Sequence, residues 1–353
     1  MVCRQIRVCH ANVRSLAAPG RLFDVELLAA AHGMDVLCLS ETWLQRNKHD
    51  SSMFMIPGFQ PPFRFDRPDG RGGGVAVYVR DQLPVQRIAL TNCLIECVAI
   101  KIHFSKKQML TILAVYRPPG LSASSVSTFC SHLDGAIDEC CSAATHPFCL
   151  VGDFNSKHSL WWGGQTSDSA GEALYSTAAD HDLTQLIDCP TRLASDSPAL
   201  LDLVFTNRPD LVSSWSVLSP LTDHCPTLVN FNLGKSVSGI ASCKFRGYCL
   251  SEADIPGLQE SLAGVDWSPI LQAANVSVAA DRWSNTVRDQ FQQFVPIRLK
   301  VFRPKSQPWY STFLVRLARC RNRLFRRSRG QPSTHSSAVA YRHVRNLYVA
   351  EIR

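Results

Sequence analysis

The segment Gly152-Asp153-Phe154-Asn155 places two side chains that can act on a phosphate ester directly after an apolar run. The run, residues 147–151, predicts a short buried strand, and Gly152 gives the backbone freedom at its end. Because Asp153 and Asn155 are two residues apart, an extended segment presents both on the same side of the sheet. There the carboxylate can activate a water molecule while the amide binds a phosphate oxygen.

Polar side chains at the ends of other predicted strands complete a candidate site. Taken singly, a strand-end Asn or Asp is more often a turn former than a catalyst. Only Asp202 stands out, because a buried carboxylate needs a partner or a metal ion. The combined set favours hydrolysis of a phosphodiester with Mg²⁺, which prefers hard oxygen ligands. The set consists of Asn12, Glu41, Tyr116, Asp153, Asn155, Asp202, Asp223 and His224.

Strands alternating with helices must position these residues. Residues 56–74, rich in Pro and Gly, are expected to be irregular. Periodicity predicts helices at 21–32, 124–141 and 170–181, and strands at 6–10, 34–39, 75–79, 94–104, 109–115, 147–151, 200–205, 215–218 and 226–231. These are too many strands for one wound parallel sheet. The sequence therefore predicts an α/β fold with two packed mixed β-sheets flanked by helices.

The composition is that of a globular chain with a sizeable core. Apolar residues make up 45% of the 353 residues, and no apolar run approaches the ~18 residues of a membrane span. Residues 1–7 lead into a strand without the apolar core of a signal peptide. The 14 cysteines include no Cys-x-x-Cys pair. We therefore expect reduced thiols in an intracellular protein without a membrane partner.

The positive charge is concentrated at the C-terminal end. Residues 298–353 contain 14 of the 37 Lys and Arg residues but one of the 29 acidic residues, so the net charge of +8 comes entirely from this tail. Within it, 313–327 has the pattern of an amphipathic helix. Its arginine face predicts salt-sensitive binding of nucleic acid or, alternatively, a solvated surface. That face comprises Arg316, Arg319, Arg323, Arg326 and Arg327, opposite Phe313, Leu314, Leu317, Cys320 and Leu324.

Six ordered motifs resemble those of the endonuclease/exonuclease/phosphatase superfamily, which implies a DNase-I-like four-layer sandwich. They are His-Ala-Asn-Val-Arg-Ser, Ser-Glu-Thr-Trp-Leu, Tyr-Arg-Pro-Pro, Gly-Asp-Phe-Asn, Leu-Asp-Leu-Val-Phe and Asp-His-Cys-Pro. More narrowly, residues 4–232 resemble the apurinic-like endonuclease of LINE-type non-LTR retrotransposons. Residues 251–329 are similar to the linker before the reverse transcriptase in those polyproteins. No polymerase follows, so the chain resembles a truncated copy.

The resemblance implies a metal site and a water-activating group. Glu41 would bind Mg²⁺, with Mn²⁺ as the alternative ion, and Asn12 would position the ion or its water. Asp153 would orient and activate the attacking water, and Asn155 would hold the scissile phosphate.

The remaining motif residues would act on the phosphate itself. Tyr116 and His224 would donate to phosphate oxygens, and Asp223 would fix the tautomer and orientation of His224. Asp202 would lie near the leaving group. His224 can be a base or an electrophile, and both roles stay open. Where many relatives have Ser-Asp-His, this chain has Thr222 in the first position, which keeps the hydroxyl group.

Basic and aromatic residues beside the motifs are candidate contacts to a DNA backbone. For Trp161, packing beneath a loop is the alternative. The resemblance implies double-stranded DNA as the substrate. The RNA of the element, bound through the basic helix, and the reverse transcriptase domain of a full-length relative would be further partners. The candidate contacts are Arg71, Arg117, Lys157, His158 and Trp161.

The predicted function is Mg²⁺-dependent nicking of one DNA strand in the nucleus, leaving a 3′-hydroxyl group that primes reverse transcription. An abasic-site repair nuclease, another phosphoesterase of the same fold and a decayed fragment that only binds nucleic acid are the alternatives, because a fold does not determine its substrate. The predicted organisation is a nuclease domain at 1–233, a linker at 234–250 and a helical basic region at 251–353.

Overall fold

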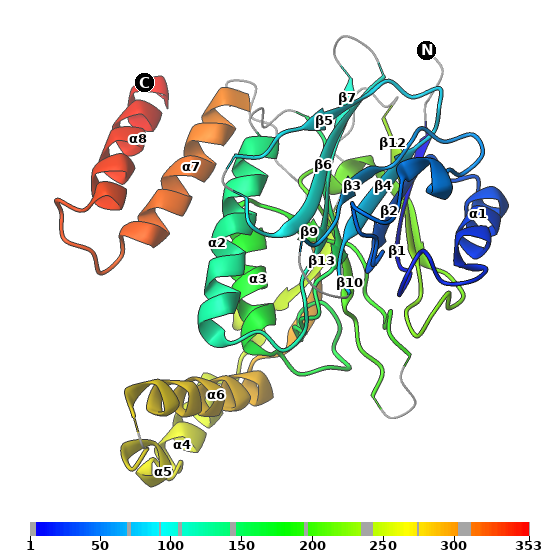
Figure 1. Ribbon diagram of the computed structural model, residues 1–353. Coiled ribbons are helices and arrows are strands. Elements are labelled where there is room, and N and C mark those ends of the chain that lie inside the picture. The colour runs from blue at the N-terminus through cyan, green and yellow to red at the C-terminus, as the bar shows by residue number, and fades with distance from the viewer. Residues whose placement is uncertain are drawn as a thin grey trace. The chain divides into compact units, whose positions relative to one another are not determined.

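The chain folds into two compact units in a computed structural model. One unit comprises residues 1–241 together with 304–353, and the other comprises 242–303. The structure describes residues 5–68, 72–91, 93–104, 108–141, 146–193, 197–233, 243–273, 275–302 and 312–352. In the first unit, two six-stranded sheets pack face to face with helices outside them (Figure 1).

The first sheet has the strand order β11-β12-β1-β2-β4-β3. Strands β1 and β2 run parallel, with Asn12 opposite Ser40, and the other neighbours are antiparallel. The strands are β1 (Gln5–Asn12), β2 (Val36–Ser40), β3 (Phe63–Phe65), β4 (Val75–Val79), β11 (Val212–Val217) and β12 (Thr227–Asn232).

The second sheet has the order β5-β6-β7-β8-β10-β9. Only β7 and β8 run parallel, which places Tyr116 opposite Asp153. Its strands are β5 (Val85–Ile88), β6 (Glu96–His103), β7 (Met109–Tyr116), β8 (Phe148–Asp153), β9 (Thr184–Gln185) and β10 (Asp202–Thr206).

The prediction of two packed mixed sheets in an α/β fold is confirmed. In these two sheets, the strands that the sequence did not predict are β3, β5 and β9. All three lie at sheet edges, where short length and partial exposure weaken the apolar pattern.

Alternation along the central strands builds two layers of core. In β2, Cys38 faces the space between the sheets, whereas Leu37 and Leu39 face outward. The outward side chains pack against Val25 and Ala29 of α1 (Arg21–His32). A central strand buried on both faces therefore reads as a continuous apolar run in the sequence.

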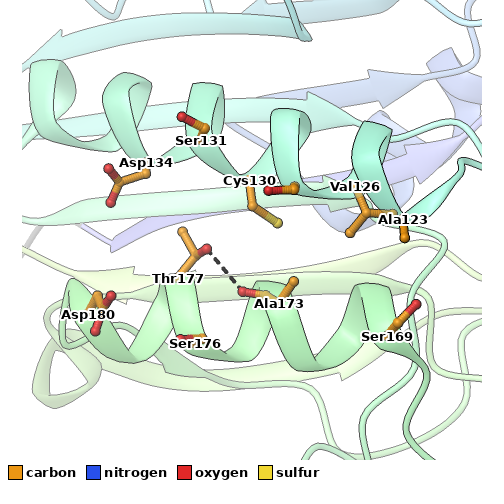
Figure 2. Close-up of a pocket in the computed structure, with 11 residues that line it drawn as sticks. Ala123, Val126, Cys130, Ser131, Asp134, Ser169, Ala173, Ser176, Thr177 and Asp180 are labelled. Atoms are coloured by element: carbon orange, nitrogen blue, oxygen red, sulfur yellow. Dashed lines mark hydrogen bonds between the residues drawn. The ribbon is translucent and has the colours of Figure 1, made fainter. Parts of the chain in front are cut away.

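Helices α2 (Ala123–Cys140) and α3 (Ser169–Asp180) lie side by side over the second sheet. Figure 2 shows small side chains facing a pocket between them, among them Cys130 and Thr177. The Thr177 hydroxyl donates to the Ala173 carbonyl of its own helix at 3.0 Å. None of the predicted site residues lines this pocket. The candidate site therefore lies elsewhere.

Gly152 is required where β7 and β8 approach each other. A Cβ atom on Gly152 would lie 1.8 Å from the carbonyl oxygen of Val115. We expect Gly152→Ala to lower the free energy of unfolding by about 2–3 kcal/mol, the upper part of the range for overpacking, as measured by urea denaturation. Gly135→Ala is the matched control, because no atom lies within 4 Å of its added methyl group. This helical position should gain about 0.5–1 kcal/mol, and equal stability of the two variants would contradict the prediction.

The second unit is a small mixed assembly. Strand β13 (Cys243–Tyr248) pairs with β14 (Ile297–Phe302), and the helices are α4 (Ile255–Ala263), α5 (Ser268–Leu271) and α6 (Val276–Phe294). The linker predicted at 234–250 thus contains a strand, and the region predicted as helical contains its partner. Both strands alternate apolar and polar residues, the pattern that indicates half-buried strands. The predicted domain boundaries themselves stay a prediction.

The basic tail forms two helices, α7 (Thr312–Ser328) and α8 (Ser336–Ile352). The amphipathic helix predicted at 313–327 is present. Arg321 stacks over the Tyr348 ring of α8 at 4.3 Å, and Arg323 forms an ion pair of 2.6 Å with Asp138 of α2. The Arg323 side chain is therefore paired within the protein and does not belong to a purely solvated surface. The side chains of the other four predicted face arginines, and of Phe313, lie outside the described part.

Short 3₁₀ helices occur at η1 (Ser51–Phe54), η2 (Pro209–Leu211) and η3 (Leu250–Glu252). The cysteines of the described residues are free thiols. Within the same ranges, no helix has the length and hydropathy needed to cross a bilayer.

Candidate active site

The predicted site residues meet at one edge of the two sheets because of strand direction. Asn12 and Asp153 end β1 and β8, whereas Asp202 begins β10. Since β10 runs antiparallel to β8, Asp202 lies opposite Asp153. His224 precedes β12, which runs antiparallel to β1. Asp202 and His224 were expected at strand ends, but they lie at strand starts that reach the same edge.

Glu41 forms the half-exposed side of the site. It follows β2 with a left-handed backbone, φ 52°, and its carboxylate receives three donors. The Tyr116 hydroxyl donates to Oε1 at 2.9 Å, the Asn12 amide to the same oxygen at 3.2 Å, and the Trp43 indole to Oε2 at 3.3 Å. Burial, followed by the charge of Glu41, raises the pKa of Tyr116 well above its ordinary value. The phenol is therefore a proton donor at any physiological pH.

Asn12 joins two carboxylates. Its Nδ2 donates to Asp153 Oδ2 at 2.9 Å and to Glu41 Oε1 at 3.2 Å, while its Oδ1 accepts from the Arg14 backbone at 3.2 Å. Through these two bonds Asn12 fixes the spacing of the carboxylates. Its role at a metal site stays a prediction.

Asp153 is fully buried among donors. Besides Asn12, it receives the Asn155 backbone N–H at 3.0 Å and the Asn155 side-chain amide at 3.2 Å. Burial and then the charge of Asp202 raise the pKa of Asp153 to about 7. Asn155 reaches Asp153 through a left-handed turn, φ 44°, and not through the extended segment that the spacing predicts.

Asp202 holds the imidazole of His224. Its Oδ2 lies 2.7 Å from His224 Nδ1 and accepts from the Thr191 hydroxyl at 2.6 Å. Burial opposes both charges, but the hydrogen bond and opposite charge lower the pKa of Asp202 and raise that of His224 to about 9. The pair is therefore ionic near neutral pH.

Asp223 does not have the orienting role expected of it. Its oxygens pair with Arg14 at 2.9 Å and with Arg192 at 3.2 Å. The two arginine side chains are 54% and 44% exposed, so they form a cationic rim beside His224. The family resemblance implied an Asp223–His224 pair, whereas the hydrogen bond of His224 Nδ1 is made with the long-range partner Asp202.

His10 is a site residue that sequence reasoning missed. Its ring is buried, with Nε2 3.1 Å from the Ser40 hydroxyl and Nδ1 3.4 Å from Asp202 Oδ1. Burial lowers the pKa of His10 to about 4, so the ring is neutral near neutral pH and its contact with Asp202 is not an ion pair. The spacing in the sequence could have indicated His10. It lies two residues before Asn12 on the same strand, so both side chains face the same side of the sheet.

Three predicted DNA contacts are buried. Arg117 donates to the backbone carbonyls of Phe154 and Asn155, both at 2.5 Å. His158 stacks on Tyr175 with ring centroids 4.4 Å apart. These two residues therefore support the loop after β8 from inside.

Trp161, the third, packs edge-on against Phe205 at 5.8 Å, which is the alternative that the sequence left open. Lys157 is half-buried, and Arg71 lies outside the described residues.

Thr222 links the loop that contains His224 to β1 through hydrogen bonds. Its hydroxyl donates to the Asn12 carbonyl and accepts from the His224 backbone, each at 3.1 Å. We expect Thr222→Ser to match the wild type and Thr222→Val to lower the free energy of unfolding by about 1–3 kcal/mol, because it leaves both partners unpaired. Thermal denaturation of the two variants measures this difference. Equal melting temperatures would show that the hydroxyl is dispensable.

The residues present fit a divalent cation. Ligand atoms of Asp153, Asp202 and His224 lie within 4.8 Å of one another. Within the described part of the chain, neither Glu41 nor Asp153 forms an ion pair with Lys or Arg, and a neutral amide joins them. Such carboxylates suit Mg²⁺. Because His224 Nδ1 already binds Asp202, Glu41 and Asp153 are the carboxylates that could hold the cation. A bound cation would supply charge stabilisation at a phosphate oxygen.

Together, the packed mixed sheets and this acid, amide and imidazole cluster define a protein of the DNase-I-like class. The chain belongs to the Endonuclease/Exonuclease/phosphatase family, whose sequence profile matches residues 9–224, more than half of the chain. No match is found among curated proteins.

Solved structures share the fold. The endonuclease domain of TRAS1, a telomere-specific non-LTR retrotransposon, is 21% identical with a TM-score of 0.52, over 66% of this chain and 100% of that domain. The AP endonuclease LMAP from Leishmania major is 15% identical with a TM-score of 0.54, over 65% and 88%. The 3′ phosphatase NExo from Neisseria, bound to a product DNA hairpin, is 17% identical with a TM-score of 0.51, over 64% and 99%.

Proposed function

We propose that the chain is a Mg²⁺-dependent DNA endonuclease that nicks one strand and leaves a 3′-hydroxyl group for target-primed reverse transcription. One observation carries the proposal. Glu41 and Asp153, two carboxylates linked through Asn12, lie beside the ionic pair of Asp202 and His224. This arrangement provides a metal-binding edge, a buried carboxylate for the water and an imidazolium for the phosphate.

Each group has a task in hydrolysis of a phosphodiester. Asp153 accepts the proton of the attacking water, and its raised pKa suits a general base near neutral pH. Tyr116 and the protonated His224 donate to phosphate oxygens as negative charge develops there. The Asn155 amide lies against Asp153, where a phosphate held by it would be in reach of the water.

The cationic rim favours a polyanion over a small phosphoester. Arg14 and Arg192, held by Asp223 and largely exposed, can contact phosphates on either side of the scissile one. A retrotransposon role is supported by the ordered motifs and by the likeness in fold to the TRAS1 endonuclease domain.

A plasmid assay tests the proposal. Supercoiled DNA is incubated with the full chain in Mg²⁺ or EDTA, beside Asp153→Asn purified in parallel as the control for contaminating nucleases. We expect open circles only with Mg²⁺ and the wild-type chain. A DNA polymerase should extend the nicks without phosphatase treatment, because they end in a 3′-hydroxyl.

The same assay distinguishes the alternatives. Cleavage confined to plasmid with abasic sites would assign a repair activity. Retardation of the plasmid on a gel without nicking would assign a binding fragment. Either result would overturn the proposed function.

A further inference from the structure

Trp43 combines an unusual backbone with a contact to a proposed metal ligand. Trp43 and Glu41 both have left-handed backbones, φ 55° and φ 52°. Bulky residues rarely adopt this conformation, and such strain persists where surrounding structure enforces it. The result is a tight turn in which the Trp43 indole N–H reaches back to Glu41 Oε2 at 3.3 Å.

The glycines at 72–74 hold this turn in place. The Trp43 backbone N–H donates to the Gly73 carbonyl at 2.9 Å, and a Cβ atom on Gly72 would lie 3.7 Å from the indole nitrogen. A Cβ on Gly74 would come within 2.6 Å of the Thr42 hydroxyl. The three glycines also have left-handed backbones, φ 87°, 69° and 87°, a conformation that residues with side chains rarely adopt. The conformation of this segment therefore favours glycine at all three positions.

The two ends of the indole have different environments. Its N–H binds the oxygen of Glu41 that Asn12 and Tyr116 leave free. Trp43 as a whole is 39% exposed, although large aromatic side chains usually pack their apolar surface. An exposed aromatic face beside the proposed cleavage point can stack on a base or pack on a sugar, contacts that tolerate any sequence.

We propose that Trp43 is a positioning residue for Glu41 and, through its exposed ring, a contact to the DNA next to the scissile phosphate. The inference deepens the proposed function and rests on it. The N–H fixes the rotamer of the Glu41 carboxylate so that it is ready for a divalent cation. The ring binds DNA independently of the cation.

Two substitutions separate the two roles. Trp43→Phe keeps an aromatic ring but removes the N–H, and Trp43→Ala removes both. Trp283→Phe is the matched control, because Trp283 is also exposed, at 53%, and lies on α6 in the other compact unit. Binding of Mn²⁺ alone is measured from the free ion by electron paramagnetic resonance. Binding of a labelled DNA duplex is measured in EDTA by fluorescence anisotropy.

We expect Trp43→Phe to raise the Kd for Mn²⁺ about tenfold, as loss of a partner that orients a ligand does, with the DNA Kd within about twofold of wild type. Trp43→Ala should show the same Mn²⁺ defect and a DNA Kd about tenfold higher. Wild-type Mn²⁺ affinity in Trp43→Phe would overturn the positioning role. Equal DNA affinity in the two variants would overturn the DNA contact.

Failure of the proposed function would give a different set of results from failure of the Trp43 proposal. If the wild-type chain binds Mn²⁺ and DNA but never nicks plasmid, the endonuclease proposal falls. The two binding measurements still decide the role of Trp43.

Discussion

Replacing Asp153 by Asn is expected to abolish phosphodiester cleavage and to change how the stability of the protein depends on pH. The amide cannot accept the proton of the attacking water, and loss of a general base costs about a thousandfold in rate. It also removes one carboxylate of the proposed cation site. Single-turnover nicking of supercoiled plasmid at saturating Mg²⁺ measures the loss.

The stability part of the prediction follows from the pKa. The folded-state pKa of Asp153, about 7, lies above its ordinary value of 3.8. For a carboxyl group this sign means that ionisation destabilises the folded state, with the full cost above pH 7 and none below pH 3.8. An uncharged Asn lacks that cost, although its NH2 group faces the amide donors of Asn12 or Asn155. In EDTA, the melting temperature of the wild type should therefore fall relative to that of Asp153→Asn as the pH rises from 4 to 8. The same pH dependence in the two proteins would contradict the raised pKa of Asp153.

Replacing Asp202 by Asn is expected to reduce the nicking rate by about 10²–10⁴-fold through His224. The amide cannot stabilise the imidazolium, and the pKa of His224 should fall from its raised value of about 9. Loss of a carboxylate that orients a catalytic His has effects of this size. NMR titration of the His224 ring tests the shift directly, and an unchanged pKa would contradict the geometry.

A double variant tests whether the two residues act as a unit. Asp202→Asn combined with His224→Asn should be no slower than the worse single variant, because residues that act together are not additive. Asp223→Asn is the matched control. Its carboxylate contacts exposed arginines, so we expect only a few-fold rise in KM for DNA, removed at high salt. A loss as large as that of Asp202→Asn would support the Asp223–His224 pairing that the family resemblance implies.

Much of the fold was predictable because central elements carry strong patterns. Helix α1 matches its predicted bounds, 21–32, and β4 its bounds of 75–79. Edge strands, by contrast, pair on one side only, so β3 and β5 lack a continuous apolar run. The β13–β14 pair joins segments far apart in the chain, and its alternation of apolar and polar residues extends over only six residues in each strand.

The sequence by itself determined the class of fold and the residues that gather at the site, because strand patterns and short motifs are local properties of the chain. Only the tertiary structure decided which partner each residue has. Asp202 binds His224 because β10 and β12 run antiparallel to their neighbours, so that Asp202 at the start of β10 and His224 just before β12 reach the edge where β1 and β8 end. Likewise, Arg117, His158 and Trp161 look like surface contacts in the sequence but are buried, since packing beneath a loop depends on elements that only the folded chain brings together.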